Sequence, residues 1–125
     1  MPHILVVDDE EAIRELVRRA LQMDGHSVEV ACDGADALDV IAARPEAFDL
    51  LLTDIRMPMM DGIALALTVG RDYPALTILL MTGYADQRER AANLELLIHD
   101  VVTKPFSLQQ IRDAVNDAIA ARKAA

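Results

Sequence analysis

A chain of 125 residues can fold as one domain with a substantial core, but it is too short for two domains. Hydrophobic residues make up 53% of it, whereas aromatic residues make up 3% and tryptophan is absent, so the core must be built from aliphatic side chains. The 12 basic and 21 acidic residues leave a formal charge of −9, which disfavours binding to nucleic acid or an anionic membrane and favours a cation or a basic protein surface as partner.

Short apolar runs alternate with amphipathic segments along the whole chain. The first run, Ile4 to Val7, is continuously apolar and typical of a strand that is buried on both faces. The amphipathic segment 11–23 predicts a helix that ends at Gly25. The pattern then predicts further strands over 27–31, 49–53, 76–81 and 101–103. Helices are predicted between them, over 35–43, 63–72 and 85–97. Ser107 caps a last helix, which is expected to fray from Ala120 to Ala125.

Five successive strand–helix units predict an α/β fold with a doubly wound parallel sheet. Right-handed crossovers would place helices on both faces of that sheet. The units are too few to close the common α/β barrel, so we expect an open sheet. No linker, repeat or low-complexity stretch interrupts the pattern, which indicates a single domain.

Polar side chains follow four of the five predicted strands. In an open parallel sheet, ligands bind at the carboxyl ends of the strands, so these side chains are expected to gather at one edge. They are Asp8 and Asp9 after the first strand, Asp54 after the third, Thr82 after the fourth and Lys104 after the fifth. Gly83 directly follows Thr82, and Pro105 directly follows Lys104.

Three carboxylates at one edge repel one another unless cations compensate their charge. Lys104 supplies one positive charge, and a hard divalent ion such as Mg²⁺ would supply the rest. A carboxylate held by these cations can attack a phosphoryl group and become an aspartyl phosphate. The Thr82 hydroxyl and the Gly83 N–H could then donate hydrogen bonds to the phosphoryl oxygens.

Four motifs occur in order along the chain: Asp8-Asp9, Asp54 within Thr-Asp-Ile-Arg-Met-Pro-Met-Met-Asp-Gly, Thr82-Gly83, and Lys104-Pro105-Phe106. Together and at these spacings they resemble the signature of a response-regulator receiver domain, although each motif alone is common. The resemblance covers nearly the whole chain. It implies a flavodoxin-like (βα)5 sheet with strand order 2-1-3-4-5.

The resemblance assigns phosphoryl-transfer roles to the residues of this edge. Asp54 would be the phosphoacceptor, and Thr82, Gly83 and Lys104 would contact the phosphoryl group. The bond before Pro105 is expected to be cis, which an X–Pro bond adopts at a cost of only about 0.5–1 kcal/mol.

The resemblance also assigns the metal ligands. Asp9 and Asp54 would bind Mg²⁺ directly, and Asp8 would bind it mostly through water. The backbone carbonyl of Arg56 would be a further ligand.

Three positions modulate this pattern. Many receiver domains carry an aromatic residue where this chain has Val101, and that ring swings inward on activation. Tyr84 lies on the loop after Thr82, and we hypothesise that its motion replaces the missing aromatic switch. Arg56 and Tyr84 occupy the variable positions beside the phosphoryl site and are expected to set the lifetime of the phosphorylated form.

Residues 1–121 are expected to form the receiver domain, residues 122–125 a frayed tail, and no output domain is expected. The resemblance implies phosphorylation by a histidine kinase or a phosphotransfer protein, and output through an unknown partner protein that binds the fourth helix, fifth strand and fifth helix. Resemblance to alphaproteobacterial single-domain receivers suggests a protease-adaptor role. The sequence is compatible with a monomer or a phosphorylation-dependent dimer.

Cysteine use and the absence of targeting segments indicate a cytoplasmic protein. Cys32 is the only cysteine, and we expect it to be a small buried hydrophobic residue. No apolar run approaches the roughly 20 residues of a membrane span, and the start of the chain lacks the cationic segment of a signal peptide. The three histidines lack metal-site spacing and are expected at the surface or at strand ends, while Met57, Met59 and Met60 are expected to pack the loop after Asp54.

Two other functions compete with the receiver interpretation. A small Mg²⁺-dependent phosphohydrolase would also use an aspartyl-phosphate intermediate, but it needs an acid two residues after the nucleophile, where this chain has Arg56. A flavodoxin-like cofactor carrier would need a glycine-rich phosphate loop and stacking aromatics, which the sequence lacks. Asp61-Gly62 is interpreted as a turn and helix start that supports the loop.

Overall fold

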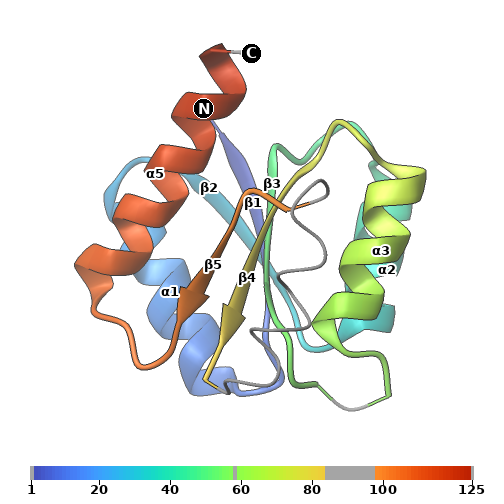
Figure 1. The fold of residues 1–125 in the computed structure, drawn as a ribbon, viewed down its shortest axis with the longest axis horizontal. Coiled ribbons are helices and arrows are strands. Elements are labelled where there is room, and N and C mark those ends of the chain that lie inside the picture. Colours follow the sequence, from blue (N-terminus) through green and yellow to red (C-terminus); the bar gives the residue numbers. More distant parts are fainter. Residues whose placement is uncertain (1, 58, 84–97, 125) are drawn as a thin grey trace.

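The computed structural model describes residues 2–57, 59–83 and 98–124, which form one parallel sheet with helices on both faces (Figure 1). Its strands are β1 (His3–Val7), β2 (Ser27–Ala31), β3 (Leu50–Asp54), β4 (Thr77–Thr82) and β5 (Asp100–Thr103), in spatial order β2-β1-β3-β4-β5. Its helices are α1 (Glu11–Met23), α2 (Gly34–Ala43), α3 (Gly62–Asp72) and α5 (Leu108–Ala124). The predicted fold class and strand order are confirmed, whereas Tyr84 and the helix expected over 85–97 lie outside the described residues.

The sheet separates two layers of helices. Figure 1 shows α1 and α5 on one face and α2 and α3 on the other. Along β1, Leu5 and Val7 pack toward α2 and α3, while Ile4 and Val6 pack toward α1 and α5. All four side chains are fully buried. A strand covered on both faces must be apolar at every position, which explains the continuous apolar run in the sequence.

The register of the sheet aligns the carboxyl ends of its strands. Val7 at the end of β1 is the partner of Thr53 in β3. Thr82 at the end of β4 is the partner of Thr103 at the end of β5. The residues that follow these positions along the chain therefore lie at the same edge of the sheet.

β3 and β4 each end one residue later than the sequence predicts. Asp54 pairs with Met81, and Thr82 pairs with Thr103, so the parallel ladder continues through both residues. These two side chains thus project from rigid strands and not from loops.

α2 and α3 begin one residue earlier than predicted, at Gly34 and Gly62. In each case the preceding aspartate, Asp33 or Asp61, accepts a 2.8 Å hydrogen bond from the backbone N–H three residues later. Asp61-Gly62, interpreted from the sequence as a turn and helix start, does begin α3, and Asp33-Gly34 begins α2 in the same way. Both aspartates are N-caps, which satisfy backbone donors that would otherwise lack a partner.

Two interpretations of single residues are wrong. Cys32 is exposed, because it directly follows β2, which is an edge strand of the sheet that the described residues form. Met59 is fully exposed and has a positive φ of 67°, so it does not pack the loop. Met57 is buried, and Met60 packs against the same core cluster, as expected for both.

α5 continues to Ala124, and the fraying expected from Ala120 stays a prediction. Near its end, the guanidinium of Arg122 donates a hydrogen bond to the carbonyl of Ala75 and lies 3.7 Å from the carboxylate of Asp49. These contacts tie the last turn of the helix to the sheet. Among the helices of the described residues, none is both long and apolar enough to span a membrane.

Candidate functional site

Asp54 is a buried carboxylate at the end of the central strand β3. Its side chain is almost enclosed, with 6% of the residue exposed, and its Oδ2 lies 3.4 Å from the Nζ of Lys104. The pKa of Asp54 is raised to about 6 by burial first, with the charges of Asp8 and Asp9 also raising it and Lys104 lowering it. At neutral pH the carboxylate is therefore ionised, and Lys104 offsets only part of the effect of burial and of the neighbouring carboxylates.

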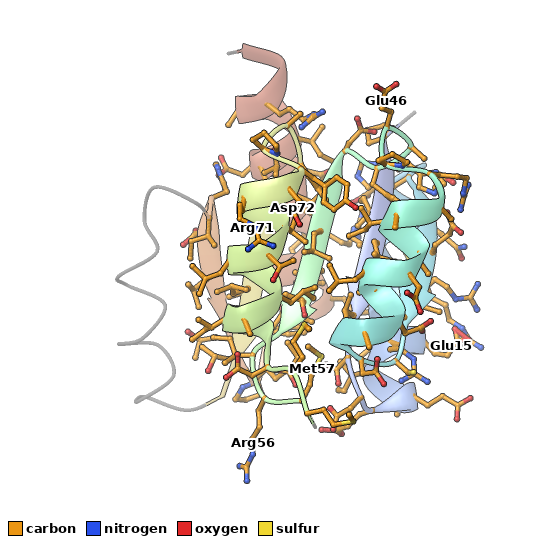
Figure 2. All side chains as sticks on the ribbon, turned by 90° about the vertical axis from the view of Figure 1, so that its right-hand side faces the viewer. Glu15, Glu46, Arg56, Met57, Arg71 and Asp72 are labelled. Atoms are coloured by element: carbon orange, nitrogen blue, oxygen red, sulfur yellow. The ribbon has the colours of Figure 1, made fainter. Side chains whose placement is uncertain are left out.

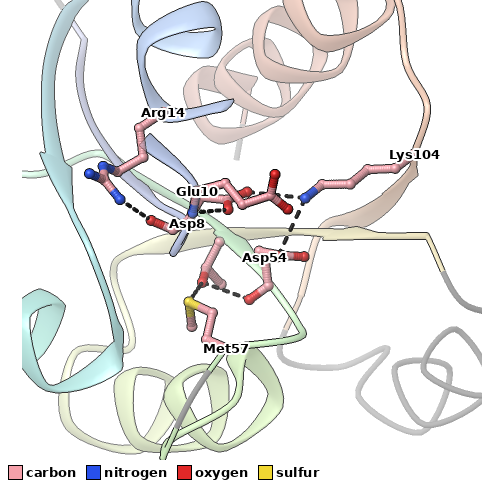
Figure 3. A network of polar contacts seen from close by, with 7 residues as sticks. Asp8, Glu10, Arg14, Asp54, Met57 and Lys104 are labelled. Carbon is pink, nitrogen blue, oxygen red and sulfur yellow. Dashed lines mark hydrogen bonds and ion pairs between the residues drawn. The ribbon is translucent and has the colours of Figure 1, made fainter. Parts of the chain in front are cut away.

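Asp8 is completely buried at the end of β1, and its polar atoms make hydrogen bonds (Figure 3). Its Oδ1 accepts a 2.9 Å hydrogen bond from the backbone N–H of Glu10, and its Oδ2 accepts one of 3.1 Å from Lys104 Nζ. Its own N–H donates to the carbonyl of Ala31. Asp9, the next residue, is exposed. The two adjacent acids are thus in different environments.

Lys104 joins the carboxylates of β1 and β3. Its ammonium lies between Asp8 and Asp54, at 3.1 and 3.4 Å. Burial opposes its charge, but the charges of Asp54 and Asp8 outweigh burial, so the pKa of Lys104 lies above its ordinary value. Its backbone N–H donates a 2.7 Å hydrogen bond to the carbonyl of Thr82, and the Lys104–Pro105 bond is cis, as the sequence analysis expects.

A cleft of about 640 Å³ opens at this edge of the sheet. Its lining includes the charged residues Asp9, Glu10, Asp54, Arg56 and Lys104. It also includes Gly83 and the apolar residues Ile13, Leu16, Pro105 and Phe106. The cleft therefore combines charged groups with apolar side chains.

The donor set at the cleft fits a hard divalent cation. Carboxylate oxygens of Asp8, Asp9 and Glu10 lie within 4.8 Å of one another, and Asp54 borders the same cleft. Mg²⁺ prefers oxygen ligands of this kind. Burial and the charges of Asp8 and Asp9 keep the pKa of Asp54 raised even though Lys104 lowers it. An added cation would be favoured there.

Two hydrogen bonds hold the backbone at Asp54 and at the next residue, Ile55. The Thr53 hydroxyl donates a 3.0 Å hydrogen bond to the backbone carbonyl of Asp54. The N–H of Gly62, at the start of α3, donates a 2.7 Å hydrogen bond to the carbonyl of Ile55. A Cβ on Gly62 would collide with the carbonyl oxygen of Asp54, so only glycine permits this close approach.

The structure brings together the main residues that the sequence singled out, and Thr82 is buried at the end of β4. Arg56 is exposed and points out from the carboxyl edge of the sheet (Figure 2). Val101 is half-buried in β5 and packs against the core cluster beneath α2 and α3. Tyr84 lies outside the described residues.

Arg14, Glu10 and Thr53 also contact the site, although no motif in the sequence marks them. Arg14 donates a 2.7 Å hydrogen bond to the backbone carbonyl of Asp8. Its only signal in the sequence is that it lies one helical turn after Glu10, on the helix that follows the paired acids. An arginine at this spacing looks the same in sequence as one on a solvated helix face, until the path of the loop between β1 and α1 is known.

A family model of the response regulator receiver domain matches residues 4–116. Response regulator MprA of Mycobacterium avium is 42% identical over 109 residues, which cover 86% of this chain and 46% of that protein. MprA of Mycobacterium tuberculosis matches over the same length with the same identity. The chain therefore spans about half the length of these curated relatives.

Solved structures share the fold over nearly the whole chain. A receiver domain protein from Clostridium thermocellum superimposes with a TM-score of 0.90 at 25% identity, covering 99% of this chain and 98% of that one. The response regulator protein TrrA from Thermotoga maritima, in complex with Mg²⁺-BeF, matches with a TM-score of 0.84 at 30% identity, covering 94% and 99%.

Proposed function

The chain belongs to the response regulator receiver domain family, and from this membership we propose that it is a switch in which Asp54 accepts a phosphoryl group in a Mg²⁺-dependent reaction. One observation carries the proposal. An ionisable, nearly enclosed Asp54 carboxylate lies 3.4 Å from the Lys104 ammonium at the mouth of a cleft that Asp9 also lines. These are the groups that an aspartyl-phosphate reaction needs.

In the proposed reaction, an oxygen of the Asp54 carboxylate attacks the phosphorus of a phosphohistidine. The bond between phosphorus and the imidazole nitrogen breaks, and the imidazole leaves with the electron pair and takes a proton from solvent. Lys104 would offset charge on the transferred oxygens, and Thr82 and the N–H of Gly83 would donate hydrogen bonds to them. A pKa of about 6 leaves Asp54 ionised, and hence nucleophilic, at neutral pH.

Asp9, Asp54 and the backbone carbonyl of Arg56 would hold the metal. Asp8 would act mostly through water, as the resemblance to receiver domains implies, while its carboxylate oxygens accept hydrogen bonds from Glu10 N–H and Lys104. Mg²⁺, when bound, would neutralise negative charge on the reacting oxygens. TrrA, which shares the fold, is solved in complex with Mg²⁺-BeF, and this supports the proposal that the present chain binds Mg²⁺.

Phosphorylation would add a charge of about −1.5 to −2 beside Lys104 and Thr82. The proposed phosphodonor is a histidine kinase or a phosphotransfer protein, and the proposed readout is the binding of a partner protein to a face that includes β5 and α5. Val101 in β5 has no aromatic ring to swing inward, so we expect Tyr84 to contribute to the switch in its place. Similarity to MprA supports a signalling role and leaves the partner open.

Intact mass spectrometry after incubation with a small phosphodonor and Mg²⁺ tests the proposal. The wild type should gain one labile phosphoryl adduct, and Asp54→Asn or removal of Mg²⁺ should abolish it. Asp39→Asn is the matched control, because Asp39 is an exposed aspartate on α2. An adduct that survives Asp54→Asn would contradict the assignment, and steady turnover of a phosphomonoester would favour a phosphohydrolase.

A further inference from the structure

Arg14 lies in the first turns of α1 and reaches back to the end of β1. Its Nη1 donates a 2.7 Å hydrogen bond to the backbone carbonyl of Asp8. Figure 3 shows the guanidinium approaching Asp8 from the side opposite Lys104. β1 ends at Val7, so the Asp8 carbonyl lies beyond the paired residues of the strand. A side chain thus supplies the donor that a neighbouring strand would supply elsewhere in the sheet.

This hydrogen bond acts on the peptide bond that leads to Asp9. Asp8 is already fixed through its N–H and through both carboxylate oxygens, and it has no exposed surface. A peptide bond is planar, so fixing the direction of the Asp8 carbonyl also fixes the direction from which the chain enters Asp9. Asp9 is exposed and lines the cleft. Its carboxylate can keep one orientation only if the backbone that carries it is held.

We propose that Arg14 is a positioning residue for the metal ligands: it holds the Asp8–Asp9 peptide bond so that the Asp9 carboxylate faces Asp54 across the cleft. This inference rests on the proposed function, because the orientation of Asp9 matters only if the two carboxylates share a cation. Arg14 touches neither cation nor substrate. It acts through the backbone, as outer partners of metal ligands commonly do.

An electrostatic role and a positioning role of Arg14 require different properties of the side chain. If Arg14 only reduced the repulsion among the carboxylates, any cation at this position would suffice. If it positions the carbonyl, the reach and planar fork of the guanidinium are needed. Arg14→Lys keeps the charge but has a shorter side chain with a single donor group, so this variant separates the two roles. Arg19→Ala is the matched control, since Arg19 is an exposed arginine on the same helix.

The test is a Mg²⁺ titration of the unphosphorylated protein, followed through its backbone amide resonances, with no phosphodonor present. We expect Arg14→Ala and Arg14→Lys to raise the Kd for Mg²⁺ by about tenfold, and Arg19→Ala to leave it unchanged. In the metal-free Arg14 variants, the amide resonances of Asp9 and Glu10 should move, while those of β3 should stay in place. Thermal unfolding of each variant records whether the fold is retained.

Each result bears on one proposal. Wild-type Mg²⁺ affinity in Arg14→Lys would mean that charge suffices, and it would overturn the positioning role. Unchanged affinity in Arg14→Ala would overturn it as well, while leaving the proposed function intact. A wild type that binds no Mg²⁺ would instead contradict the proposed function. If Arg14→Ala does not fold, a folded Arg14→Lys with weakened Mg²⁺ binding still supports the inference.

Discussion

Asp54 is the residue at which function and stability conflict most directly. Its reaction needs an ionised carboxylate, whereas its burial favours the neutral carboxyl group. Its pKa is raised to about 6, first by burial and then by the charges of Asp8 and Asp9, while in an unfolded chain it would titrate near its ordinary value of 3.8. Between these two pH values the folded protein keeps a proton that the unfolded chain has lost. The stability due to the neutral carboxyl group is therefore present below about pH 4 and is lost as the pH rises through about 6.

Asp54→Asn should accordingly stabilise the metal-free protein at pH 7.5, by on the order of 2 kcal/mol, because asparagine removes the buried charge. The gain should disappear near pH 4, where Asp54 is neutral in the folded state. Denaturant unfolding in the presence of a chelator measures both values. The exposed Asp39→Asn control should show no such dependence. An equal gain at pH 4 and pH 7.5 would contradict the role assigned to ionisation.

At the residue scale, the sequence was most informative where several residue types had to coincide. Asp8, Asp54 and Lys104 were predicted to meet because each follows a predicted strand, and the structure brings them together. The sequence predicts a buried Cys32 because free cysteines are usually buried, but its exposure depends on β2 being the edge strand. Arg14 could not be found, because its contact with Asp8 depends on how the loop returns to the strand.

At the scale of elements, the start of α3 and the end of β3 are built as one unit. Gly62 N–H binds the carbonyl of Ile55, and the glycine Cα lies against the backbone of Asp54. α2 begins with the same Asp-Gly pair, but a Cβ on Gly34 would meet the Met60 side chain, whose sulfur lies 2.8 Å away. Backbone cannot move aside as a flexible methionine can. The two helix starts thus look alike in sequence but differ in what surrounds them.

Gly62→Ala should therefore destabilise the protein by on the order of 2 kcal/mol, within the range found for overpacked sites. It should also slow phosphorylation, because the collision displaces Asp54. Gly34→Ala is the matched substitution and should cost clearly less, with phosphorylation retained. Denaturant unfolding and the rate of adduct formation measure the two effects. Equal losses of stability in both variants would mean that the backbone near Asp54 can move aside, which would contradict the close packing of Gly62 against it.

Element boundaries were predicted to within one residue for β3, β4, α2 and α3, and the small errors have physical causes. The apolar run of β3 stops before Asp54, yet hydrogen bonding of the ladder continues into the polar residue. Likewise, the apolar pattern of α2 and α3 begins after the glycines, although the capping aspartates start each helix earlier. Hydrophobic patterning reports burial, whereas the end of an element is set by where its backbone hydrogen bonds stop.

At the scale of the whole molecule, one polar cluster joins segments that are far apart in sequence. Asp24, at the end of α1, receives hydrogen bonds of 2.6–3.1 Å from the Arg112 guanidinium and one of 3.0 Å from Asn116, both on α5. His26 Nε2 lies 2.8 Å from the Asn116 Oδ1. The cluster links the two helices on one face of the sheet. Hydrophobic patterning could predict that these helices share a face, but it could not predict this pairing.

The Asp24–Arg112 pair should stabilise the packing of α1 on α5 in a pH-dependent way. The Arg112 and Asn116 hydrogen bonds hold the pKa of Asp24 at about 2, below its ordinary value of 3.8. The lowered pKa means that this stabilisation is present above about pH 4 and is lost as the pH falls toward 2. Asp24→Asn, Arg112→Gln and the double variant form a cycle in which each single change should lower the Tm at pH 7, with the double variant losing less than the sum.

The Arg71–Asp72 pair provides the comparison for that cycle, because both partners are neighbours on α3 and largely exposed. The pKa of Asp72 is also lowered, first by its hydrogen bond with Arg71. Solvent screens the charges of an exposed pair, however. A contact between adjacent residues also restricts the unfolded chain little, because the two are already neighbours. We expect no measurable coupling in Tm for Arg71→Gln and Asp72→Asn. Equal coupling in the two cycles would show that the α1–α5 contact gains nothing from joining residues 88 positions apart. Stabilisation by the Asp24–Arg112 pair would then be local, and the packing of α1 on α5 would depend on apolar contacts alone.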